Sequence, residues 1–175
     1  RRENLRYFTN FNPLEPDALA VFSPSQGSIL LVPIASEVSR AQGEAWTNEI
    51  ISYEGDIQLV CSALKNLNIK KKLGIVGWEY IPANLVIEIK KSFHDLELVD
   101  ITPSVHQIRI VKTASEIKKI ERAAQIADAA FEYLVQNIKP GLKEYEVISL
   151  VEYKIRQSHG DDNFQILASS KGDSK

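Results

Sequence analysis

The sequence predicts an α/β domain with a mixed sheet flanked by helices, followed by the first helices of an incomplete α+β domain. Two apolar runs joined by a turn lie near the start, and strand-like and helix-like segments then alternate as far as residue 101. From Thr113 onward the pattern is almost continuously helical. This change of pattern divides the chain into an expected domain 1–110 and the start of a second domain, 111–175.

The predicted sheet begins with a β-hairpin between residues 18 and 32. There the runs ALAVF and SILLV flank SPSQG, whose residues favour turns. A third short strand, EIISY, is expected at 49–53. A helix should follow it, because apolar residues then recur at helical spacing. These residues are Ile57, Val60, Leu64 and Leu67.

The order of strand and helix then repeats. LGIVG at 73–77 is typical of a strand, and ELVDI at 97–101 predicts another. Between them Pro82 opens a predicted helix, since proline suits the first turn. The apolar face of this helix consists of Leu85, Val86, Ile89 and Phe93. Strands that alternate with helices in this way indicate a sheet covered by helices.

The second part of the chain opens with a capping box, in which Thr113 and Glu116 each satisfy an amide of the first helical turn. The helix that follows carries one apolar stripe and ends at the breaker 139–141. The stripe consists of Ile117, Ile120, Ala124, Ala127, Phe131, Leu134 and Ile138. Burying each large apolar side chain contributes roughly 1.5–3 kcal/mol, so this stripe should face a core or a partner.

A second helix is expected at about 143–158, with apolar residues on more than one side. Gly160 stops it, and FQILA at 164–168 predicts the first strand of a new sheet. Two helices and one strand cannot close a core. We therefore expect the second domain to be incomplete in this chain.

Composition limits the classes of function. The chain has 175 residues, of which 44% are apolar and 25% charged, as in soluble globular proteins. The formal net charge is −2 and the basic residues are scattered, so we expect no nucleic-acid partner. No apolar run approaches the ~20 residues of a membrane span, so no membrane partner is expected. Cys61 is the single cysteine, which favours the cytoplasm. Methionine is absent, even at residue 1, so we expect either that both ends are trimmed or that methionines are missing from the sequence.

Three segments carry motifs of a known family. ENLRYFTNF at 3–11 is similar to an opening strand of the type Arg-Tyr-Leu-Thr-Gly-Phe. The segment 108–134 is similar to a linker and first catalytic-domain helix, and PGLKEYEV at 140–147 to the following turn and second helix. The frame Arg-x-x-Lys-x-x-x-Glu-Ile of that linker falls on Arg109, Lys112, Glu116 and Ile117. Together these segments resemble the creatinase/prolidase/aminopeptidase P family.

This resemblance implies a subunit of two domains, the second with the α+β pita-bread fold. That domain holds two divalent metal ions (Mn, Co, Zn or Fe) through Asp, His and Glu ligands that lie downstream of this chain. A metal-bound hydroxide would attack a carbonyl carbon and cleave a C–N amide bond in a small peptide or amide substrate. The fold also hosts creatine-hydrolysing, ectoine-hydrolysing and lyase chemistries, so the resemblance leaves the substrate open.

The resemblance also implies that this chain is the substrate-gating and dimerisation portion of a homodimeric hydrolase of the Xaa-Pro peptidase or creatinase type. We expect no catalytic residue and no metal ligand within it, and therefore no activity of the 175-residue chain alone. Its histidines, His94, His106 and His159, are widely separated and lack paired metal-ligand spacing. The alternative is a non-catalytic protein-binding module with the same aminopeptidase-like fold.

Two aromatic residues are candidates for lining the substrate pocket of the intact protein. Trp46 lies in the polar segment QGEAWTNE, where no apolar periodicity explains a large aromatic side chain. In dimers of the resembled family, a loop of one amino-terminal domain helps to wall the active site of the other subunit, and Trp46 could serve there. Phe164 is the second candidate. Packing within their own domains is the alternative for both residues.

Overall fold

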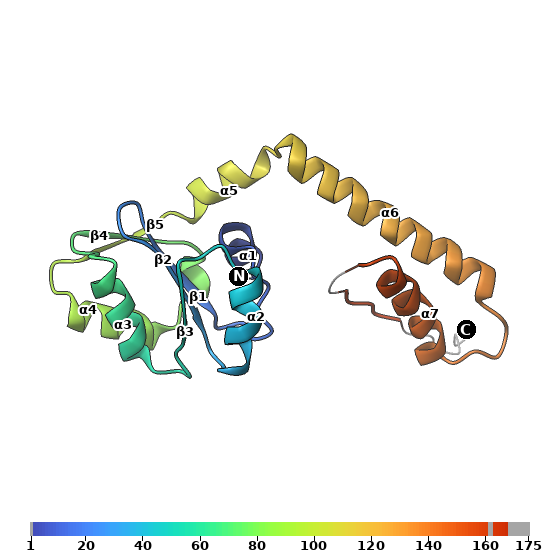
Figure 1. The fold of residues 1–175 in the computed structure, drawn as a ribbon, viewed down its shortest axis with the longest axis horizontal. Helices are drawn as coiled ribbons and strands as arrows, with labels where there is room; N and C mark the ends of the chain where they lie inside the picture. Colours follow the sequence, from blue (N-terminus) through green and yellow to red (C-terminus); the bar gives the residue numbers. More distant parts are fainter. Residues whose placement is uncertain (1, 161–162, 168–175) are drawn as a thin grey trace, which may run out of the picture. The chain divides into compact units, whose positions relative to one another are not determined.

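Five strands form two sheets in the computed structural model, which describes residues 2–160 and 163–167 (Figure 1). In the first sheet, β1 (Leu19–Ser23) pairs antiparallel with β2 (Gly27–Val32), and β2 pairs parallel with β3 (Glu49–Ser52). The second sheet is the parallel pair of β4 (Lys72–Ile75) and β5 (Glu97–Asp100). The predicted hairpin and mixed sheet are confirmed, although the strands fall into two sheets.

The chain divides into two compact units, Arg1–Arg109 and Ile110–Lys175. The helices of unit 1 are α1 (Arg2–Thr9), α2 (Ser36–Glu44), α3 (Ile57–Asn66), α4 (Ala83–Ser92) and α5 (Thr102–Ile110), with a short 3₁₀ helix at Trp78–Tyr80. Helices α3 and α4 lie on one side of the three-stranded sheet, and α1 and α2 lie on the other (Figure 1).

The middle strand β2 is buried on both faces. Ile29 and Leu31 join the core beneath α3 and α4, whereas Leu30 and Val32 join the core beneath α1 and α2. Side chains of a strand alternate between its two faces, so consecutive apolar residues fit a strand covered on both sides. The run SILLV is therefore the centre of unit 1.

The segment expected as an opening strand is a helix, so that prediction was wrong. Arg, Leu and Glu in RENLRYFT favour helix, and the hydroxyl of Thr9 donates to the Leu5 carbonyl 2.8 Å away. Asn10 ends the helix with a positive φ of 61°, which asparagine tolerates better than most residues. Its amide donates to the Arg6 carbonyl. Helices α2 and α5 were not predicted either.

Unit 2 consists of α6 (Ala114–Asn137) and α7 (Glu144–Gln157), which pack against each other. The predicted capping box at Thr113 is present, with the Thr113 hydroxyl accepting from the Glu116 amide and the Glu116 carboxylate accepting from the Thr113 amide. The strand expected at 164–168 is not formed, because residues 164–167 have no regular structure. Ala168 lies outside the described residues.

Most of the predicted apolar stripe of α6 is exposed in the described residues. The ring of Phe131 is 66% exposed and Ile120 is 54% exposed. Helix α7 covers a different face of α6, on which Ala130 is buried. The core or partner expected for the stripe is therefore not found within the described part of unit 2.

Within residues 2–160 and 163–167, the helices are too short or too polar to cross a membrane.

Candidate functional site

Trp46 occupies the short connection between α2 and β3. Its side chain is 67% exposed, while its backbone amide donates to the Thr9 carbonyl at 2.9 Å. The preceding amide, that of Ala45, donates to the Ala41 carbonyl and closes α2. The backbone at Trp46 is thus tied to the end of α1 while the indole ring points outward. The polar surroundings of Trp46 in the sequence indicated an outward-facing side chain, and its exposure in the structure agrees with that indication.

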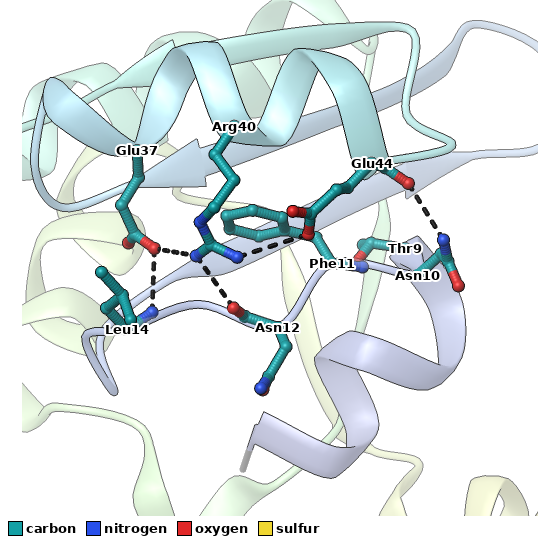
Figure 2. Close-up of polar contacts among 8 residues, drawn as sticks. All are labelled: Thr9, Asn10, Phe11, Asn12, Leu14, Glu37, Arg40 and Glu44. Atoms are coloured by element: carbon teal, nitrogen blue, oxygen red, sulfur yellow. Dashed lines mark hydrogen bonds and ion pairs between the residues drawn. The ribbon is translucent and has the colours of Figure 1, made fainter. Parts of the chain in front are cut away.

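A polar cluster ties α2 to the loop that follows α1 (Figure 2). The Arg40 guanidinium donates to the Asn12 carbonyl at 2.9 Å and to the Glu37 carboxylate at 2.5 Å, and pairs with the Glu44 carboxylate at 3.3 Å. The same guanidinium lies 4.3 Å from the centre of the buried Phe11 ring, within cation–π range.

Glu37 is the buried member of this cluster. Its residue is 1% exposed, and its Oε1 atom also accepts from the Leu14 amide at 2.8 Å. Its Oε2 atom has no hydrogen-bond partner among the described residues. A buried carboxylate oxygen without a donor is uncommon in folded proteins and calls for an explanation. Sequence reasoning missed this residue, because SEVSRAQGE reads as a polar segment.

Phe164, the other predicted pocket residue, belongs to unit 2 and is 86% exposed. Its neighbours Ile166 and Leu167 are exposed apolar residues as well. Core packing of Phe164 does not occur within the described residues. Its role in a pocket stays a prediction.

An aromatic row on unit 1 was also missed by sequence reasoning. The Tyr7 and Phe8 rings meet edge to face with centroids 5.2 Å apart, and the Phe8 and Phe22 rings are 5.9 Å apart. The Arg109 guanidinium lies 5.5 Å from the Tyr7 ring and donates to the Asn4 carboxamide. The row joins two adjacent residues of α1 to Phe22 on β1, so only the fold brings its members together.

Two groups with shifted pKa values serve the fold of unit 1. Burial, and then the charge of Asp17, raises the pKa of Tyr53, whose hydroxyl donates to the Asp17 carbonyl at 2.8 Å. The Thr102 hydroxyl and amide donate to Asp100 and lower the pKa of that exposed carboxyl. The same hydroxyl oxygen accepts from the Gly77 amide at 2.8 Å, which joins the ends of β4 and β5.

A surface hollow of about 340 Å³ lies where α3 and α4 end. Lys65 and Lys70 line it together with His94 and Asp95, so its charges are mixed. Lys65 also lies over the ring of Phe93, 5.9 Å from its centre. Among the described residues that line the hollow, the polar ones are all exposed, so they do not form a site that selects one ligand.

No group of three or more His, Cys, Asp or Glu side chains able to hold a metal ion occurs within residues 2–160 and 163–167. The two divalent metals of the resembled family therefore do not fit the residues described here.

Comparison with known families tests the family resemblance that the motifs indicate. The creatinase/prolidase N-terminal domain model matches residues 1–111, and the model of metallopeptidase family M24 matches residues 118–174. The chain belongs to the creatinase/prolidase N-terminal domain family. The resemblance stated from the motifs is confirmed, and the M24 match follows in the order that the motifs implied.

Relatives and solved structures agree with this membership. An uncharacterised peptidase of Bacillus subtilis, YqhT, is 29% identical over 171 residues, which cover 95% of this chain and 46% of the relative. An X-Pro aminopeptidase from Thermotoga maritima superposes with a TM-score of 0.70 at 27% identity, over 90% of this chain and 43% of that one. An Xaa-Pro dipeptidase from Bacillus anthracis gives 0.64 at 30% identity, over 90% and 42%. This creatinase/prolidase N-terminal domain chain therefore spans less than half the length of these relatives.

Proposed function

We propose that this chain is the amino-terminal portion of a metal-dependent hydrolase that cleaves the amide bond of Xaa-Pro peptides. The observation that carries the proposal is the succession of the two family matches, at 1–111 and 118–174, along one chain. The names of the similar solved structures, an X-Pro aminopeptidase and an Xaa-Pro dipeptidase, support the substrate class. The division into domains 1–110 and 111–175 belongs to the same proposal.

The metals of this proposal are two divalent ions, Mn, Co, Zn or Fe, which supply the hydrolytic chemistry when bound. The described residues offer no cluster to hold them, so no reaction step is assigned to a side chain of this chain. What the chain contributes is a scaffold and a surface. The protein would act in the cytoplasm, as a homodimer.

Within this proposal Trp46 lines the substrate pocket of a neighbouring subunit. Support comes from its 67% exposure on a backbone held by Thr9, because rigidly mounted, exposed aromatic side chains suit pockets and interfaces. Phe164 has a second, weaker claim, which rests on its exposure in the unit that matches the M24 family.

The test compares two polypeptides: this chain, and the same chain extended to the length of its relatives. With Mn, Co, Zn or Fe added, we expect the extended protein to hydrolyse Xaa-Pro dipeptides and the 175-residue chain to remain inactive, since its described residues hold no set of metal ligands. Turnover that copurifies with the short chain would contradict the assignment of catalysis to later residues. An extended protein without turnover and without bound metal would overturn the enzymatic proposal.

Trp46→Ala tests the pocket role in the extended protein. We expect a higher KM or a lower kcat/KM with unchanged metal content, because only a wall of the pocket is removed. Trp78→Ala is the matched control, since Trp78 is a partly exposed tryptophan elsewhere in unit 1. Equal kinetic effects of the two substitutions would remove the special role of Trp46.

The second candidate function is a protein-binding module with an aminopeptidase-like fold. The exposed apolar stripe of α6 favours it, because large exposed apolar surfaces mark binding sites. Metal titration separates the two functions, since a binding module takes up no stoichiometric pair of metal ions.

A further inference from the structure

The Arg40 side chain is the centre of the polar cluster in Figure 2, and its contacts reach two different elements. On α2 it pairs with Glu37 and Glu44, and on the loop after α1 it donates to the carbonyl of Asn12. Its guanidinium also stacks over Phe11, a buried residue of that loop. A planar group with several fixed donors can hold all of these partners at once, which an ammonium group cannot.

Glu37 adds a second bond between α2 and the same loop, because its carboxylate accepts from the Leu14 amide. This carboxylate is buried, and its Oε2 atom finds no donor among the described residues. Such a pair is weak evidence for stability, since apolar residues of similar volume often replace buried ion pairs without loss. An ion pair of this kind can instead hold the loop in one fixed position on α2.

The loop that this pair holds follows directly on Thr9, the residue whose carbonyl accepts the Trp46 amide. Glu44, the last residue of α2, offers its carbonyl to the side-chain amide of Asn10 at 3.1 Å. Thr9, the residue before Asn10, accepts the amide of Trp46. The loop that Arg40 and Glu37 hold therefore begins at the two residues that tie down the end of α2 and the backbone of Trp46.

We propose that Glu37 and Arg40 are positioning residues, which lock the loop 10–14 onto α2 and thereby fix the direction in which Trp46 leaves the surface. The proposal rests on the proposed function only where it treats Trp46 as a residue of the substrate pocket. The lock itself is a property of unit 1. It gives a role to a buried carboxylate whose Oε2 atom has no hydrogen-bond partner among the described residues.

Amide hydrogen exchange on the 175-residue chain tests the lock. In a variant with Glu37→Leu and Arg40→Met, which replaces the pair by apolar groups, we expect the Leu14 and Trp46 amides to exchange about tenfold faster or more, as local opening allows. The amides of β2 should keep their rates, because the double variant leaves the residues of β2 and their pairing with β1 and β3 unchanged.

The matched control is the Glu88 and Lys91 pair on α4, which has the same spacing and an N–O distance of 3.6 Å. Glu88→Leu with Lys91→Met should leave the exchange of Leu14 and Trp46 unchanged. If the first double variant leaves these two amides protected, the lock does not exist. If it speeds the amides of β2 equally, the pair acts on global stability and the proposal is wrong.

A milder variant covers the case in which the double variant does not fold. Arg40→Lys keeps the charge near Glu37 but cannot reach Asn12, Glu37 and Glu44 together. We expect faster exchange at Trp46 with a smaller change at Leu14, whose acceptor on Glu37 remains. An exchange pattern identical to that of the unchanged chain would overturn the role of Arg40.

Kinetics of the extended protein then separate this inference from the proposed function. If that protein is a peptidase, Glu37→Leu with Arg40→Met should raise KM and leave kcat nearly unchanged, because the chemical step is not touched. An inactive extended protein would end the proposed function and leave the exchange result standing. If the extended protein is active but the Leu14 and Trp46 amides stay protected in the double variant, the lock is disproved and the proposed function stands.

Discussion

The two units of the chain differ in how far their apolar residues are buried. In unit 1 the residues of β2 lie between two layers of helices, and Leu30 and Leu31 have no exposed surface. In unit 2 only Ala130 is buried on α6, while Phe131 beside it is mostly exposed. A periodic apolar pattern shows which face of an element avoids water. It does not show what covers that face.

The difference in burial between the two units agrees with the family matches. The creatinase/prolidase N-terminal domain model ends at residue 111, near the end of unit 1, and unit 2 matches the M24 family, whose members here are more than twice as long as this chain. Unit 1 can therefore close its core from its own residues. Unit 2 presents an apolar surface that the described residues of unit 2 itself leave open.

The largest expected effect contrasts one residue from each unit. Leu31→Ala should lower the free energy of unfolding by about 2–5 kcal/mol, because it leaves a cavity between two packed layers. Ile120→Ala on the exposed stripe should change it by no more than about 0.5 kcal/mol. Urea unfolding followed by circular dichroism measures both. A large loss at Ile120 that grows with protein concentration would show that the stripe is covered by association in solution.

Much of unit 1 could be predicted because its signals are local. The hairpin has a turn between two apolar runs, and β3, β4 and β5 are short apolar segments next to helical patterns. The capping box at Thr113 is local as well, since its two side chains are three residues apart. In each case neighbouring residues determine the structure.

The missed helices depend on contacts that are distant in sequence. The apolar residues of α2, among them Val38 and Ala41, are few and small, and pack on Phe11 and Leu30. Helix α1 carries aromatic residues that also suit a strand, so a family likeness to an opening strand was the stronger signal. Its helical form is supported by packing on the sheet, which propensity alone does not include.

The candidate site also combines a feature that local sequence indicated with a feature that depends on contacts distant in sequence. The polar surroundings of Trp46 indicated an outward-facing side chain, with packing on its own domain as the alternative. The structure exposes the side chain, and its pocket role stays a prediction. Glu37 could not be found from sequence, because its burial is produced by a loop whose contact residue, Leu14, lies 23 positions earlier. A glutamate on a polar helix is ordinarily solvated, and only the loop changes that.

An intermediate effect is expected at the start of α6. Thr113→Ala should cost about 1 kcal/mol, because the hydroxyl that caps the Glu116 amide is lost. The loss should appear in unit 2 alone, as lower helicity or earlier unfolding of α6. Thr113→Ser keeps the hydroxyl and is the control. A loss spread equally over the core of unit 1 would show that the two units unfold together.

The smallest effect concerns the acid side of the same cap. The backbone amide of Thr113, and then its hydroxyl, donate to the Glu116 carboxylate and hold its pKa below the ordinary value of 4.5. A depressed pKa means that this bond supports the cap above pH 4.5 and is lost as the pH falls through the folded value.

Titration of the Glu116 carboxyl by NMR measures that pKa directly. Thr113→Ala should raise it only partway, because the backbone amide at residue 113 still donates to the carboxylate. Ser115→Ala is the control, since it leaves both donors of Thr113 in place. A Glu116 pKa at 4.5 in the unchanged chain would mean that the cap is open in solution, and α6 would then begin later than Ala114.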